Sequence, residues 1–138
     1  MGVRIPLLML LVLMSLVSTT YADPACDNEQ ALAMKTDSKV PFKAMLQLQQ
    51  DGAPLNAAFS AIITLCDFNQ APGTKISFDA PMPAHKHGMN YEPDIVMVSD
   101  YVFEVNNLLF HMPGIWQLEV TMFENGSPHR FTYNVNVQ

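Results

Sequence analysis

The sequence predicts an all-β fold in which about seven short antiparallel strands form a two-layer sandwich. Apolar and polar residues alternate with a period of two through most of the chain beyond residue 40, the pattern of strands that bury one face. Turn residues interrupt this alternation at short intervals, and helical periodicity is scarce. Because each strand is apolar on one face only, two sheets must pack face to face to bury those faces.

The first 22 residues have the features of a secretory signal peptide. Arg4 gives a short positive region, residues 7–14 are an unbroken apolar run, and small residues precede a cleavage position at Asp23. We therefore expect a periplasmic or secreted protein. The apolar run is shorter than the about 20 residues that span a bilayer, and no second candidate follows, so no membrane span is expected in the mature chain.

Residues 23–39 show no clear period and are expected to form an N-terminal arm, with one helical turn at residues 31–35, before the domain at 40–138. The only two cysteines are Cys26 and Cys66. In an oxidising compartment they are best explained as a disulfide that ties the arm to a strand. Two alternatives are a thiolate metal ligand, although Cys66 has no His or Met nearby, and a lipid-modified Cys26, although no apolar residue stands at Asp23.

Seven segments of the domain are expected as strands, with Asp51-Gly52 and Asn125-Gly126 among the turns between them. They are Phe42 to Leu48, Phe59 to Cys66, Lys75 to Ala80, Ile95 to Val98, Tyr101 to Val105, Trp116 to Met122 and Phe131 to Val137. An immunoglobulin-like sandwich accommodates this number and spacing. Trp116 starts an inward-facing set and is expected in the core.

Charge and motif content exclude several function classes. The chain has 13 acidic against 7 basic residues, a net charge of −6 and no run of Lys or Arg. Binding along phosphates requires clustered cations, so nucleic acid is not an expected partner. The carboxylates form no pair suited to acid–base catalysis, and no Ser nucleophile motif is present, so we do not expect an enzyme.

The segment from Met82 to Pro93 carries the most distinctive chemistry. If the backbone of this segment is extended, the side chains of His85, His87 and Met89 project to the same side. Its prolines place it at an edge or in a loop, where such side chains stay accessible. Imidazole and thioether donors together favour copper, above all Cu(I), whereas zinc competes if only the imidazoles bind.

A second pair, His111-Met112, stands directly before Pro113-Gly114 and is expected to end a strand at the same rim of the sandwich. Convergence with His85 and His87 would give three imidazoles. The alternatives are that the His-x-His pair is merely a surface feature, and that Met89 or Met112 fills the core. The fourth histidine, His129, lies beside a turn and is expected to be solvated.

Two motifs resemble the YtkA-like domain family, which is related to FixH-like proteins. They are Met-Pro-x-x-x-His-x-Met from Met82 to Met89, followed by Tyr91-Glu92-Pro93, and Phe110-His111-Met112-Pro113-Gly114-x-Trp116. The likeness covers about residues 38–137. It implies a small extracytoplasmic immunoglobulin-like sandwich, often associated with copper handling or with the assembly of copper oxidases. On the motif match it implies metal contact at His85, His87 and Met89, with His111 and Met112 second.

The leading expectation is therefore an exported copper-binding protein that sequesters copper or passes it to a copper-accepting envelope protein. The alternative is a metal-independent, immunoglobulin-like module that recognises a protein partner through a sheet edge. A copper enzyme is disfavoured, because predicted cleavage leaves Asp23 rather than a histidine at the N-terminus.

Overall fold

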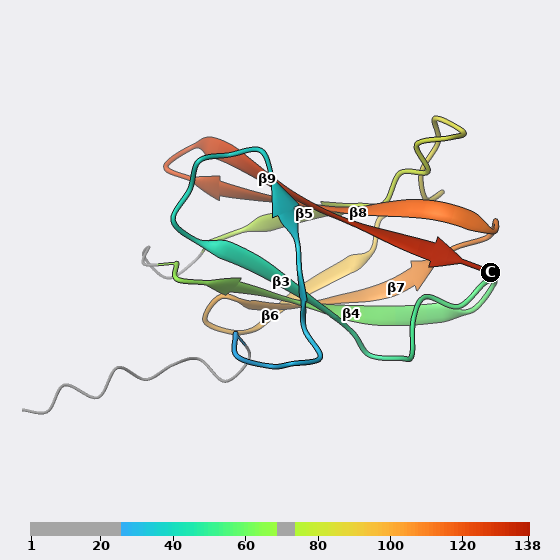
Figure 1. Cartoon of the computed structure of the whole chain (residues 1–138), viewed down its shortest axis with the longest axis horizontal. Helices are drawn as coiled ribbons and strands as arrows, with labels where there is room; N and C mark the ends of the chain where they lie inside the picture. Colours follow the sequence, from blue (N-terminus) through green and yellow to red (C-terminus); the bar gives the residue numbers. More distant parts are fainter. Residues whose placement is uncertain (1–25, 69–73) are drawn as a thin grey trace, which may run out of the picture.

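A computed structural model describes residues 26–68 and 74–138 of the chain; the expected signal peptide lies outside them. The predicted antiparallel sandwich is confirmed. A five-stranded sheet with the order β1-β3-β4-β7-β6 packs against a four-stranded sheet with the order β2-β9-β8-β5 (Figure 1). The strands are β1 (Leu32–Ala33), β2 (Lys35–Thr36), β3 (Lys43–Leu48), β4 (Ala58–Cys66), β5 (Ile76–Asp79), β6 (Asp94–Ser99), β7 (Val102–Leu109), β8 (Gly114–Glu124) and β9 (Ser127–Val137).

All seven predicted strands are present, as β3 to β9, with ends that differ from the expected ones by up to a few residues. The two additional strands are β1 and β2, where the sequence suggested a helical turn at residues 31–35. That expectation is wrong. β1 pairs with β3 in one sheet and β2 pairs with β9 in the other, so the arm bridges both sheets. Strands of two residues are too short to show a period, and tertiary pairing decides their conformation.

The arm is attached by three kinds of interaction. The Cys26–Cys66 disulfide joins its start to the end of β4, as predicted. The Met34 amide donates to the Ala44 carbonyl oxygen at 2.9 Å, and the Met34 side chain is buried. The segment 26–36 is therefore part of the folded domain.

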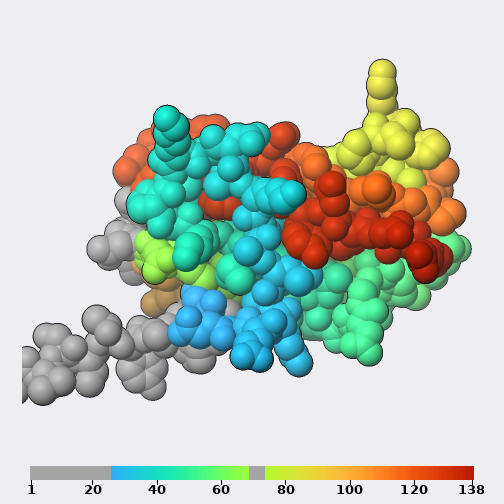
Figure 2. Space-filling view, in the orientation of Figure 1, coloured from blue at the N-terminus to red at the C-terminus, as the bar shows by residue number. Residues whose placement is uncertain are grey.

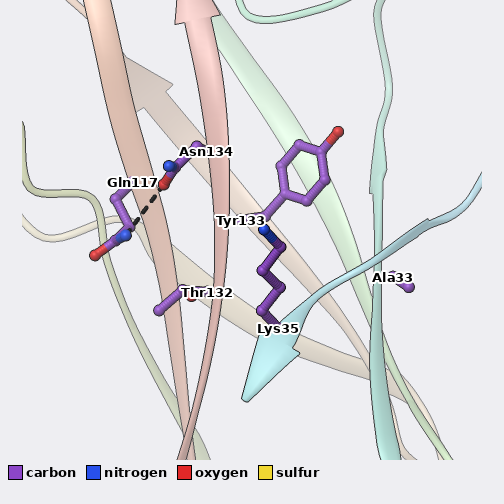
Figure 3. A pocket seen from close by; sticks show the side chains of 6 residues that line it. All are labelled: Ala33, Lys35, Gln117, Thr132, Tyr133 and Asn134. Atoms are coloured by element: carbon purple, nitrogen blue, oxygen red, sulfur yellow. Dashed lines mark hydrogen bonds between the residues drawn. The ribbon is translucent and has the colours of Figure 1, made fainter. Parts of the chain in front are cut away.

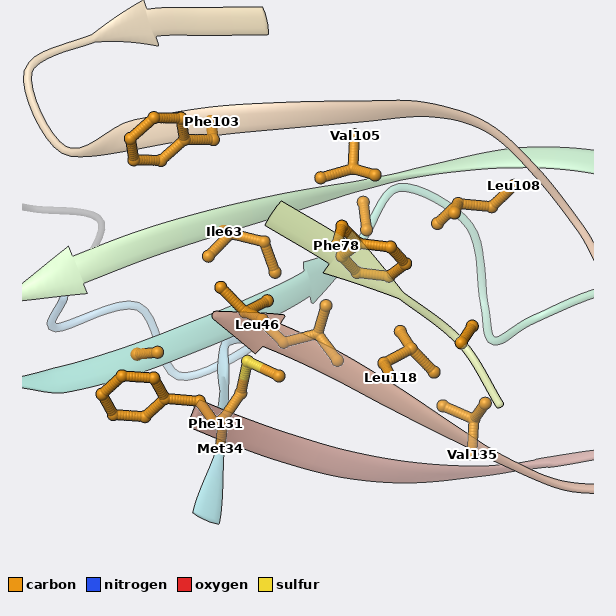
Figure 4. Close-up of a cluster of buried hydrophobic side chains, with 14 of the residues drawn as sticks. Met34, Leu46, Ile63, Phe78, Phe103, Val105, Leu108, Leu118, Phe131 and Val135 are labelled. Atoms are coloured by element: carbon orange, nitrogen blue, oxygen red, sulfur yellow. The ribbon is translucent and has the colours of Figure 1, made fainter. Parts of the chain in front are cut away.

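The core lies between the two sheets (Figure 4). Alternate residues of β3, β4, β7, β8 and β9 point into it, as period-two strands require. The prediction for Trp116 is confirmed, since its side chain is 0% exposed. The largest fully buried side chains are Trp116, Phe110, Phe131, Leu46, Ile63, Met82, Leu108, Leu118, Met122, Val105, Val120 and Val137.

Two connections meet at one end of the sandwich. The long connection from β5 to β6 carries residues 80–93, and the short one from β7 to β8 carries residues 110–113. The Gln117 amide of β8 donates to the Pro81 carbonyl oxygen at 2.8 Å and so joins the first connection to β8, which follows the second. In the space-filling view the yellow segment of the first connection stands out from the surface beside the orange residues of β8 (Figure 2). Within the described ranges, no helix is long and apolar enough to cross a membrane.

Candidate metal centre

The histidine-bearing part of the β5–β6 connection is a tight turn, not an extended segment. Residues 83–86 form the turn, and Lys86 takes a left-handed conformation with φ of 54°. The Met82 amide donates to the His87 carbonyl oxygen at 2.6 Å, while the His85 and Lys86 amides both donate to the Met82 carbonyl oxygen at 3.0 Å. The predicted extended backbone is therefore wrong. The physical reason is that these local hydrogen bonds replace the ladder that the flanking prolines weaken.

The turn nevertheless keeps the two imidazoles together. The ring centroids of His85 and His87 are 5.8 Å apart, with their planes inclined by 37°. His85 is exposed and His87 is half-buried. The Nδ1 atom of His87 lies 3.4 Å from the Gly88 carbonyl oxygen, and it can donate to that oxygen in the tautomer that carries the proton on Nδ1.

The third histidine comes from the β7–β8 connection. The rings of His87 and His111 are stacked, with centroids 5.7 Å apart and planes inclined by 28°. His111 therefore lies beside His87, and His87 is the common neighbour of His85 and His111. We refer to His85, His87 and His111 as the imidazole cluster.

Trp116 packs against two rings of this cluster, those of His87 and His111. Its ring makes edge contacts with His87 at a centroid distance of 6.0 Å and with His111 at 5.5 Å. It is itself stacked on Phe110 at 4.5 Å. The Trp116 Nε1–H donates to the Met112 carbonyl oxygen at 2.9 Å, which fixes the turn that carries His111. Two rings of the cluster therefore rest on the rigid core.

The methionines of the two connections do not all lie where the sequence predicted. Met82 is buried, and Met89 and Met112 are half-buried against the core. Met89 lines a separate surface hollow, whose lining includes none of the histidines. That lining consists of Ser77, Phe78, Asp79, Met89, Asn90, Tyr91, Glu92 and Pro93. Because the backbone is not extended, the argument that placed Met89 in phase with His85 and His87 fails.

The distances between ring centroids in the imidazole cluster can be compared with the distance between two imidazoles that bind the same metal ion. Two imidazoles that bind one ion through nitrogens at about 2.0–2.1 Å have ring centroids roughly 5–6 Å apart. The 5.8 and 5.7 Å separations lie within that range. Over residues 26–68 and 74–138, no group of three or more His, Cys, Asp or Glu side chains could hold a metal ion in the positions they occupy. The His87 and His111 rings are stacked and the His85 and His87 rings are tilted, so the rings must rotate to direct their nitrogens at a common point. That torsion has a broad minimum in histidine.

Tyr91 and His129 are not counted among the candidate metal ligands. Desolvation raises the pKa of the Tyr91 phenol above its ordinary value of 10.0, so it is protonated at neutral pH. His129 belongs to β9, where it pairs with Met122, and lies outside the cluster. Its side chain is only 16% exposed, and its Nε2 lies 3.2 Å from Glu124 Oε2. The expectation that His129 is solvated is wrong, because β8 and β9 extend further than predicted and Phe42 packs against its ring.

A second surface hollow, lined by residues of β1, β2, β8 and β9, is a weaker candidate for a binding site than the imidazole cluster (Figure 3). It is lined by Ala33, Lys35, Gln117, Thr132, Tyr133 and Asn134. Its amides satisfy each other, since Gln117 Nε2 donates to Asn134 Oδ1 at 3.1 Å. The imidazole cluster is therefore the stronger candidate site.

Searches against protein-family models, curated proteins and solved structures found no match to this chain. The resemblance to the YtkA-like domain family stays a prediction from the two motifs.

Proposed function

We propose that this protein is an exported copper-binding protein that holds one ion at His85, His87 and His111. The observation that carries the proposal is the position of His87, whose ring centroid lies 5.8 Å from that of His85 and 5.7 Å from that of His111. These residues come from two connections at the same end of the fold. Three imidazoles gathered at an accessible rim are a common way to bind a transition metal.

Copper is the proposed metal because of the donor types. Nitrogen sites bind divalent copper more tightly than the other divalent first-row metals, zinc included. A thioether would extend this preference to Cu(I), and Met112 follows His111 in the chain and is half-buried. Met89 could act as a further donor only after its segment rearranges. The disulfide between Cys26 and Cys66 is consistent with an oxidising compartment such as the periplasm.

The different exposures of the ligands suit a protein that exchanges its ion. His85 is exposed, whereas His87 and His111 are half-buried against Trp116. We propose that His85 is the first ligand to leave when a copper-accepting envelope protein approaches. Delivery and simple sequestration would use the same site.

Copper titration of the mature protein tests the proposal. We expect about one equivalent of Cu(I) to bind and to change the fluorescence of Trp116, the only tryptophan in the chain. The double variant His85→Ala, His87→Ala should lose this binding, because only one imidazole of the cluster remains. His129→Ala is the matched control and should bind like the wild type, since His129 contacts Glu124 and Phe42 instead. Unchanged stoichiometry in the double variant would refute the proposal.

A second candidate function is a metal-independent protein-interaction module, and one observation favours it. β6 is an edge strand, and its residues Ile95, Val96, Met97 and Val98 are all exposed, Val96 by 50%. An apolar edge strand can accept an added strand from a partner. Recovery of the same partners in a pull-down with copper chelated, and with the double histidine variant, would favour this function over copper binding.

A further inference from the structure

Met82 is buried in a place where a loop residue between two prolines would ordinarily be exposed. Its side chain is 1% exposed. The terminal Cε of Met82 lies only 2.6 Å from the position that a Cβ atom would take at Gly114. The Met82 methyl group therefore occupies the space that any side chain at residue 114 would need. Gly114 also has a φ of +126°, which L-residues rarely adopt.

The main chain of Met82 determines the shape of the histidine turn. Its amide donates to the His87 carbonyl oxygen, and its carbonyl oxygen accepts from the His85 and Lys86 amides. Met82 and His87 form an isolated antiparallel bridge. Met82 is thus joined through its backbone to both histidines of the turn.

The side chain of Met82 packs against Gly114, the first residue of β8. Gly114 opens β8 three residues after His111, and the Gln117 amide, three residues further along β8, donates to the Pro81 carbonyl oxygen at 2.8 Å. A single buried side chain consequently joins the turn that carries His85 and His87 to the start of β8, directly after the connection that carries His111.

We propose that Met82 is the positioning residue of the imidazole cluster and that its thioether acts by packing, not as a metal ligand. Its side chain holds the turn against Gly114 and thereby keeps the His87 ring beside the His111 ring. The consequence for copper affinity rests on the proposed function, but the consequence for ring geometry does not. Partners that orient metal ligands typically change metal affinity 10- to 100-fold when they are lost.

Three variants of the mature protein test this role. Met82→Ala removes the packing, and Met82→Leu keeps most of the volume but removes the sulfur. Met122→Ala truncates an equally buried methionine of β8 that pairs with Ile76 and His129, away from the cluster. If Met82→Ala does not fold, Met82→Val replaces it. The readouts are the nuclear Overhauser effect between the His87 and His111 ring protons without metal, and the copper Kd.

We expect Met82→Ala to lose the ring contact and to bind copper at least about 10-fold more weakly, while Met82→Leu and Met122→Ala keep both properties. The positioning role is overturned if Met82→Ala keeps the ring contact, or if Met122→Ala loses it equally. It is also overturned if Met82→Leu keeps the ring contact and loses copper, because the sulfur would then be a ligand. A wild type that binds no copper would refute the proposed function, and the ring contact would still decide the role of Met82.

Discussion

Replacing both cysteines by serine is expected to destabilise the protein by about 4 kcal/mol, on the chain-entropy estimate for a closed loop of this size. The disulfide joins residues 40 positions apart and ties the start of the arm to the end of β4. Without it the unfolded chain gains conformational freedom, and only short pairings and Met34 hold the arm. Urea unfolding of the Cys26→Ser, Cys66→Ser variant measures the loss.

The wild type under reducing conditions is the control for this prediction. It should unfold at the same urea concentration as the double serine variant, since both lack the same covalent bond. Equal stability of the serine variant and the oxidised wild type would show that the disulfide contributes nothing to the fold. The ring contact between His87 and His111 should persist in the variant, because the disulfide is not part of the imidazole cluster.

Replacing Trp116 by alanine is expected to cost about 3–5 kcal/mol, the usual range for truncating a buried aromatic residue. Trp116 is 0% exposed, stacks on Phe110 at 4.5 Å and touches the rings of His87 and His111. The variant should therefore also weaken copper binding, because the cluster loses its support. Unfolding followed by circular dichroism, and copper titration by calorimetry, measure the two effects.

Trp116→Phe separates packing from hydrogen bonding. Phenylalanine retains an aromatic ring against Phe110 but cannot donate to the Met112 carbonyl oxygen. A smaller cost is expected, about 1–3 kcal/mol if that carbonyl is left without a partner. A cost within about 0.5 kcal/mol for Trp116→Ala, as at exposed positions, would contradict the burial described for this residue.

The strands were predictable because their signal is local. β8 alternates Trp116, Leu118, Val120 and Met122 with polar residues, and each of these four is buried in the structure. The segment from Leu32 to Thr36 could not be assigned in this way. Its conformation depends on pairing with β3 and β9, which are distant in sequence, and two-residue strands contain no period to detect.

The candidate site was predictable in part. The Pro113-Gly114 turn indicated that His111 ends a strand, whereas β7 ends at Leu109 and His111 lies two residues beyond it, with its ring beside that of His87. The conformation of residues 82–87 was not predictable from alternation, because it depends on hydrogen bonds to the Met82 carbonyl oxygen and on the space above Gly114. The packing of Met82 against Gly114 joins residues that are far apart in the sequence. Counting alternating apolar and polar residues does not detect such a contact.

Histidine-resolved nuclear magnetic resonance during Cu(I) titration tests the central claim most directly. The chain contains four histidines, so His129 serves as an internal reference. We expect the ring resonances of His85, His87 and His111 to shift together and to saturate at about one equivalent, with His129 unchanged. If the three rings do not respond, or respond no more than His129, the imidazole cluster is not a copper site.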